Sequence, residues 1–314
     1  MVGGGVAGLS AAVTLGRALR TVLVVDSGEP RNAPADGVHG YLTREGMNPL
    51  ALQAAGRIEA ESYGATVVRA EAVSLRPTTN GFEVGLGDGR RVTGRRLLLT
   101  TGLADRLPNI TGLQEQWGKG VVHCPYCHGY EIRHQQIGVL GTGPMSVHQT
   151  FLFRQWSDDI TLFLNDTVAP TEDEMARLAA RSVRVVEGVV ESVDNETGLL
   201  TGVTLSDGTR FELQALAVAT RMEARANLLE PLGLQVAEHP LGAGHFIEAD
   251  PTGATSVDGV YVAGNISNLA AQVIVAAAEG TTAATAINAG LIEEETALAV
   301  RALRKPSPTG RKLT

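Results

Sequence analysis

The sequence predicts an α/β protein with two Rossmann-like three-layer domains, and three observations support that prediction. The 314 residues include 37 glycines and are 44% hydrophobic but only 4% aromatic, which suits many tight turns between strands and helices. A chain of 314 residues also favours two domains over one. Finally, a glycine-rich turn, a helix and a β-branched strand follow one another twice along the chain.

The first of these units opens with the run Gly3-Gly4-Gly5-Val6-Ala7-Gly8. A helical run from Leu9 to Leu19 and a buried strand from Thr21 to Asp26 follow it. Gly3, Gly5 and Gly8 have the G-x-G-x-x-G spacing that permits a tight turn, close approach of a diphosphate and close helix packing. Asp26 stands 23 positions after Gly3 (26 minus 3), where an acid accepts hydrogen bonds from a ribose. We expect dinucleotide binding here rather than an ordinary glycine-rich loop.

Only Met1 and Val2 precede this turn. A strand is expected at that position, in the centre of the sheet. We therefore expect that the start of the chain was clipped or misassigned, or else that the lack of this strand weakens the domain.

The second unit has the strand Ile137 to Leu140, a helix from Val147 to Trp156 and the strand Ile160 to Leu164. Its turn is Gly141-Thr142-Gly143-Pro144-Met145-Ser146, with serine in place of the third glycine. The residues after the last strand, Asn165-Asp166-Thr167-Val168, include no cation for the 2′-phosphate of NADPH. The fold of a nicotinamide domain is therefore predicted without its usual NADP(H) contacts. Asp166 could accept a hydrogen bond from the ribose of NADH, so NAD(H) binding stays an alternative.

The only two cysteines are Cys124 and Cys127, spaced as Cys-x-x-Cys just before the second unit. This spacing is typical of a redox disulfide. His128 follows directly and could act as a base, because the pKa of histidine lies near neutrality; the alternative is a histidine that only hydrogen-bonds the loop. Zinc binding by the cysteines with His123 and His128 is disfavoured, since adjacent residues rarely converge on one metal. We expect no metal, and we assign His123 to structure or surface.

These motifs, with the stretch Thr255 to Asn265, resemble the low-molecular-weight thioredoxin reductases among the FAD-dependent pyridine nucleotide-disulfide oxidoreductases over nearly the full chain. The resemblance implies a discontinuous FAD domain, residues 1–111 and 244–314. A domain of residues 112–243, which carries the redox cysteines, is inserted into it. Hinges would lie near residues 111–112 and 240–244. The resemblance also implies a homodimer.

Three departures make the resemblance more specific. His128 and Asn265 replace aspartates of the family, and the arginines of the NADPH motif are absent. The segment Cys124 to Glu131 is more similar to dithiol oxidases that close disulfides in natural products of the holomycin and gliotoxin type. These relatives use FAD and pass electrons to dioxygen. By resemblance, Cys127 faces the flavin and Cys124 exchanges with the substrate.

The resemblance also implies FAD contacts. Gly264 and Asn265 are expected to touch the FAD, and the ring end is expected to meet Ala271, Gln272 and Val273. Arg31 and Asn32 would bind the diphosphate or the ribityl chain, although their segment also suits an ordinary surface turn. The remaining expected contacts are Val6, Ala7, Ser27, His39, Val73, Thr101 and Gly102, with His39 near the ring.

Charge, hydropathy and cysteine content bear on which partners the protein binds and where in the cell it is found. A formal net charge of −8 argues against nucleic acid. The most apolar stretch, Leu269 to Ala278, is short and contains Gln272, so no membrane span is expected. No basic region precedes the apolar residues at the N-terminus, and two cysteines argue against a secreted disulfide scaffold. We expect a cytoplasmic protein with a solvated basic tail at residues 301–314.

Three functions remain open at this point. The leading hypothesis is an FAD-dependent dithiol oxidase that uses dioxygen and acts on a small dithiol. The second is a disulfide reductase supplied by NAD(P)H, with a disulfide or a thioredoxin-like protein as partner. The third is a flavin-binding redox sensor without turnover, against which the intact cysteine pair argues.

Overall fold

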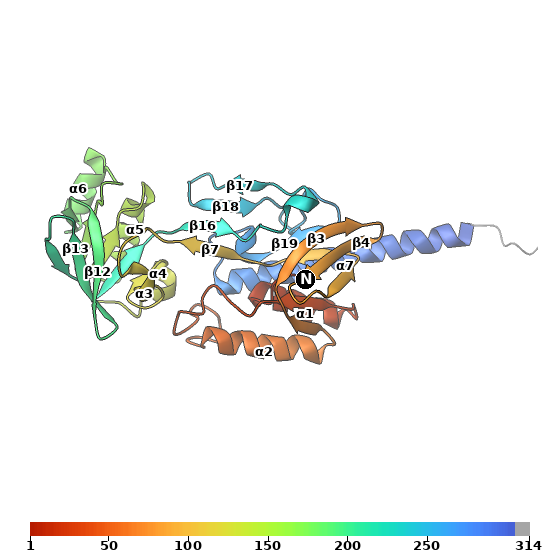
Figure 1. Ribbon diagram of the computed structural model, residues 1–314. Coiled ribbons are helices and arrows are strands. Elements are labelled where there is room, and N and C mark those ends of the chain that lie inside the picture. The colour runs from red at the N-terminus through yellow and green to blue at the C-terminus, as the bar shows by residue number, and fades with distance from the viewer. Residues whose placement is uncertain (305–314) are drawn as a thin grey trace, which may run out of the picture.

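The structure is a computed structural model that describes residues 1–304. Figure 1 shows two groups of elements, with β7 (Leu103–Arg106) and β16 (Arg221–Ala224) side by side between them. The predicted tail lies outside the described residues from position 305 onward. No helix within residues 1–304 has the length and apolar character needed to cross a membrane.

The first group is a three-layer unit around a parallel sheet. Its strands are β2 (Thr66–Arg69), β1 (Leu23–Asp26), β6 (Leu97–Leu99) and β19 (Val260–Val262). One face is covered by the helices α1 (Val6–Arg17), α2 (Pro49–Ser62) and α7 (Val273–Arg304), with small residues such as Ala11 and Ala283 fully buried between α1 and α7. The other face carries the antiparallel strands β3 (Ala72–Thr78), β4 (Gly81–Leu86) and β5 (Arg91–Gly94).

The short segment before the glycine turn occupies the centre of this sheet. Val2 forms parallel bridges to both Val25 and Leu99, so it joins β1 to β6. The Met1 amine donates a hydrogen bond of 2.7 Å to the Leu23 carbonyl. Burial lowers the pKa of this amine from 8.0 to about 6. The two residues thus supply the backbone pairing of the expected strand.

The second group has the same architecture. Its parallel sheet has the order β11 (Arg184–Val186), β10 (Ile160–Phe163), β9 (Ile137–Leu140), β15 (Ala215–Val218) and β8 (Val121–Val122). An antiparallel sheet packs on it, with strands β12 (Val190–Glu196), β13 (Leu199–Leu205) and β14 (Arg210–Glu212). The helices are α3 (Leu113–Gln116), α4 (Pro125–His128), α5 (Met145–Phe153) and α6 (Glu172–Ala180). The predicted fold of two Rossmann-like α/β domains is therefore confirmed.

The chain returns to the first group earlier than the sequence suggested. β16 pairs with β7 and β18 (Gly244–Ile247), and β17 (Val236–Glu238) pairs with β18. Leucines between β16 and β17 join the core of the first group: Leu229, Leu232 and Leu234. The prediction of a hinge at residues 240–244 is wrong, because this segment is the turn between β17 and β18 in one sheet. We propose to draw the inserted domain at about residues 107–220 instead of the predicted 112–243.

Candidate active site

One cavity of about 1230 Å³ lies where the two groups of elements meet. The redox residues Cys124, Cys127 and His128 line it. Every predicted FAD contact except Gly8 lines it as well: Gly3, Gly5, Val6, Ala7, Asp26, Ser27, Arg31, Asn32, His39, Val73, Thr101, Gly102, Gly264, Asn265, Ala271, Gln272 and Val273. Residues that are far apart in the sequence thus face one space, from the glycine turn to the cysteines.

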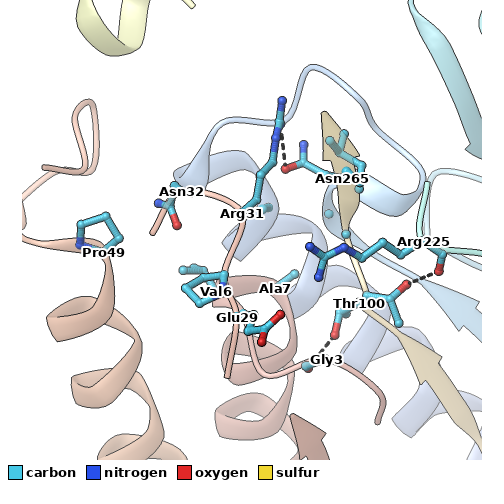
Figure 2. Close-up of a pocket in the computed structure, with 18 of the residues that line it drawn as sticks. Gly3, Val6, Ala7, Glu29, Arg31, Asn32, Pro49, Thr100, Arg225 and Asn265 are labelled. Carbon is cyan, nitrogen blue, oxygen red and sulfur yellow. Dashed lines mark hydrogen bonds between the residues drawn. The ribbon is translucent and has the colours of Figure 1, made fainter. Parts of the chain in front are cut away.

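The glycine turn leaves its backbone open to the cavity (Figure 2). Gly3 has a φ of +106°, and a Cβ there would lie 2.3 Å from the Thr100 carbonyl oxygen. A Cβ on Gly8 would lie 2.1 Å from the Gly3 carbonyl oxygen, so Gly8 serves the packing of the turn and not its open face. A Cβ on Gly5 would meet nothing within 4 Å. The N-terminus of α1 therefore has free access to a ligand, as binding of the FAD diphosphate requires.

Asp26 is oriented by two groups next to the turn. Its carboxylate accepts hydrogen bonds from the Gly4 amide at 2.9 Å and from Gln53 Nε2 at 3.1 Å. Gln53 Nε2 also donates to the Gly4 carbonyl at 2.9 Å. Asp26 keeps oxygen lone pairs for a ribose diol, and Gln53 on α2 fixes its position. No sequence motif marks Gln53, so it was not among the predicted site residues.

Arg31 is held by an aspartate from the strand between the two groups. Its Nε and Nη2 donate to the Asp105 carboxylate at 2.6 and 2.7 Å, and Nη1 lies 3.4 Å from Asn265 Oδ1 (Figure 2). Thr220 Oγ1 donates to Asp105 at 2.7 Å. Burial raises the pKa of Asp105, but the hydrogen bonds and charge of Arg31 outweigh it and lower the pKa overall. Arg31 as a diphosphate or ribityl contact stays a prediction.

Replacing Asp105 by asparagine is expected to destabilise the protein by about 2 to 3 kcal/mol, because it leaves the Arg31 guanidinium without its anion. The pKa of Asp105 is lower in the folded state, so its contribution is present above the unfolded pKa of 3.8 and is lost as the pH falls through the lowered value. Urea unfolding at pH 7 and pH 3 measures this difference. Thr220→Val is the matched control, since it removes one hydrogen bond, worth about 1 kcal/mol, but keeps the ion pair. Equal stability of Asp105→Asn and the parent at pH 7 would contradict the assignment.

The sulfurs of Cys124 and Cys127 are 2.7 Å apart and are not joined as a disulfide in the structure. Pro125 starts the short helix α4, and the Cys127 amide donates to the Cys124 carbonyl at 3.2 Å. The hydrogen bond from the Cys127 thiol lowers the pKa of Cys124 to about 7, and the same interaction raises the pKa of Cys127. The Gln272 side chain, from the predicted ring end of the FAD site, also hydrogen-bonds Cys124. At neutral pH the thiolate of the reduced pair is therefore on Cys124.

Three histidines line the same cavity as the cysteine pair. Both ring nitrogens of His128 are buried without a hydrogen-bond partner among the described residues, and burial lowers its pKa. His123, which the sequence analysis assigned to structure or surface, lines the cavity, with its Nδ1 3.1 Å from the Val218 carbonyl. His39 contacts Glu45 at 2.6 Å and Glu131 at 3.6 Å, so it links the first group to the turn after the cysteines. A neutral imidazole at His128 is suited to accept a proton from a thiol.

The residues of the cavity fit FAD from end to end. Asp26 would hold the adenosine ribose, the open turn at Gly5 the diphosphate, and the segment from Ala271 to Val273 the ring. When bound, FAD accepts two electrons from a dithiol pair and passes them on. No group of three metal-binding side chains occurs in residues 1–304.

Comparisons with known proteins identify the family. The sequence model of the pyridine nucleotide-disulphide oxidoreductase family matches residues 1–280. The thioredoxin reductase sirT of Leptosphaeria maculans is 30% identical over 306 residues, which cover 92% of this chain and 92% of that protein. The crystal structure of HlmI is similar with a TM-score of 0.90 and 42% identity, covering 96% of this chain and 94% of that one.

A second solved structure, the oxidoreductase from Agrobacterium tumefaciens, has a TM-score of 0.87 and 36% identity. It covers 93% of this chain and 97% of that one. Both the sequence and the fold are thus shared over nearly the whole chain. The chain belongs to the pyridine nucleotide-disulphide oxidoreductase family and is a thioredoxin reductase-like, FAD-dependent oxidoreductase that acts on sulfur groups.

Proposed function

We propose that this flavoprotein oxidises a small dithiol to a disulfide, with dioxygen as the final electron acceptor. The observation that carries the proposal is the state of the second glycine-rich turn, where NAD(P)H would bind. In the turn before α5, the Thr142 amide is bonded to Ser146 and Pro144 has no amide hydrogen, and no cation follows the next strand in residues 165–168. These features disfavour NAD(P)H as the electron donor, and a dithiol at Cys124 and Cys127 would supply the electrons instead.

Two side chains of the second domain bond to backbone groups of that turn, the Thr142 amide and the Gly141 carbonyl. Ser146 Oγ accepts a hydrogen bond from the Thr142 amide at 3.0 Å. Asn165, at the end of β10, donates to the Gly141 carbonyl at 3.1 Å and accepts from the Val190 amide at 2.9 Å. Pro144 at the N-cap of α5 contributes no amide donor. A diphosphate at this helix N-terminus would therefore lack two amide donors, those of residues 142 and 144, while the space beside Gly143 is open.

The chemistry of the dithiol can be written with this chain's own residues. A substrate thiolate attacks the disulfide at Cys124 and releases Cys127 as a thiolate, which gives a mixed disulfide. His128 takes the proton of the second substrate thiol, and that sulfur displaces Cys124 and leaves as the cyclised disulfide. Two electrons have then moved from the substrate to the cysteine pair; one proton left when the first substrate thiol ionised, and the second is on His128. Bound FAD would supply the route for the two electrons to dioxygen, which with two protons would become hydrogen peroxide, and Cys124 and Cys127 would close again as the disulfide.

An anaerobic titration of the FAD-loaded protein tests the proposal. Dithiothreitol, NADPH and NADH are added separately while the visible absorption of oxidised flavin is followed, and air is admitted afterwards. Bleaching by dithiothreitol alone, reversed by air with one hydrogen peroxide per flavin, is the expected result. Rapid bleaching by NADPH or NADH would instead identify a reductase and reject the oxidase.

The second candidate is an NAD(P)H-dependent disulfide reductase. The names of relatives favour it, since those from Leptosphaeria maculans and Aspergillus oryzae are called thioredoxin reductases. Its partner would be a disulfide or a thioredoxin-like protein. A homodimer and a cytoplasmic location remain predictions under either function.

A further inference from the structure

Three arginines line the FAD cavity: Arg31, Arg106 and Arg225. The guanidinium of Arg31 is engaged by Asp105 at 2.6 and 2.7 Å. In the described part of the chain, no hydrogen bond or ion pair engages the guanidinium of Arg106 or Arg225. Arg106 lies at the end of β7 that leads to the inserted domain, opposite Arg221. Arg225 lies at the other end, next to the glycine turn.

The backbone of Arg225 is fixed to the chain that follows β6. Its amide donates to the Gly102 carbonyl at 2.9 Å, and its carbonyl accepts from Thr101 Oγ1 at 2.9 Å. Thr100, the residue before Thr101, donates through Oγ1 to the Gly3 carbonyl at 2.8 Å. The segment from Thr100 to Gly102 is therefore hydrogen-bonded both to Arg225 and to the first glycine of the turn. Figure 2 shows its guanidinium pointing from this anchor into the cavity.

We propose that Arg225 binds the diphosphate bridge of FAD. The N-terminus of α1 at Gly5 offers open backbone amides, but a helix terminus carries only about half of a positive charge. The diphosphate is a dianion at neutral pH, so a cation beside the turn complements it. A guanidinium donates two parallel hydrogen bonds to phosphate oxygens, a geometry that an ammonium group lacks. The role does not depend on the oxidase proposal, because both candidate functions use FAD.

This assignment differs from the expectation for Arg31. Two of the donors of Arg31 are used by Asp105, and a third lies 3.4 Å from Asn265. The sequence shows no signal for Arg225. This residue follows β16, which lies within the predicted inserted domain of residues 112–243 but pairs with β7 and β18 of the first group. Only the antiparallel pairing of Ala224 with Leu103 brings it to the cofactor site.

Flavin rebinding to the apoprotein tests the role of Arg225 by flavin fluorescence. Arg225→Ala is expected to raise the Kd of FAD roughly 10- to 100-fold, the range for a charged hydrogen-bond pair. Riboflavin, which has no phosphate, should bind the variant within about twofold of the parent. ADP, which carries the diphosphate without the flavin, should lose its ability to compete with FAD. Arg225→Lys should bind FAD with intermediate affinity, and Arg177→Ala, which removes an exposed arginine of α6, should leave the Kd unchanged.

Two results would overturn the proposal. An unchanged Kd for FAD and ADP, with a raised KM for a dithiol substrate, would assign Arg225 to the substrate. Equal weakening of FAD and riboflavin would show that the substitution disturbs the cavity in general.

Discussion

Replacing Cys127 by serine is expected to abolish the reduction of bound flavin by dithiols. The variant has one sulfur at the redox site, so Cys124 can form a mixed disulfide but the pair cannot close or open as a disulfide. We expect the rate of flavin bleaching by dithiothreitol to fall roughly 10³-fold or more, as for removal of an essential nucleophile. FAD content should not change, because serine replaces only the sulfur atom of Cys127 and keeps the lining of the cavity. Stopped-flow absorption under nitrogen measures the rate.

The variants also separate the two sulfurs. The hydrogen bond from the Cys127 thiol is the largest cause of the lowered pKa of Cys124, about 7. Serine keeps a donor at this position and alanine does not, so the pKa of Cys124 should be higher in Cys127→Ala than in Cys127→Ser. The ultraviolet absorption of the thiolate against pH measures both values. Flavin bleaching at the parental rate in either variant would remove Cys127 from the mechanism.

Local motifs allowed much of the cofactor site to be predicted. The glycine turn and Asp26 lie within one stretch of sequence, and the spacing of Gly3, Gly5 and Gly8 is read without knowing the fold. The structure adds the reason for each glycine: two of them would bring a Cβ onto backbone oxygens, and Gly5 faces open space. The Cys-x-x-Cys spacing was equally local, and both sulfurs line the same cavity as the turn.

Residues that act through long-range contacts could not be predicted. Asp105 lies 74 positions from Arg31, and Gln53 lies 27 positions from Asp26. Neither pair has a spacing rule, because each depends on how separate elements pack. The hinge was misplaced for a related reason: the glycines of residues 240–244 suit a linker and a hairpin turn equally, and only the pairing of β17 with β18 decides between them.

The second prediction with a large effect concerns His128. Both of its ring nitrogens are buried and without a partner within residues 1–304. A buried polar group without a partner is costly and needs an explanation, and a substrate thiol at the adjacent cysteine pair provides one. Burial lowers the pKa of His128, against the opposing charge of Glu131. The imidazole is therefore neutral, and able to accept a proton, at and somewhat below its ordinary pKa of 6.5.

His128→Ala is expected to lower kcat/KM for a dithiol by roughly 10²- to 10⁴-fold near neutral pH, the usual effect of removing a general base. The parent should lose activity only as the pH falls through the lowered pKa of His128. The variant should approach the parent above about pH 9, where the thiols of the substrate ionise without a base. Added imidazole should restore part of the neutral-pH activity of the variant. His148→Ala, which removes an exposed histidine of α5, is the matched control. An equal loss at every pH would assign His128 to holding the loop, because a residue that only shapes the site has no proton to exchange.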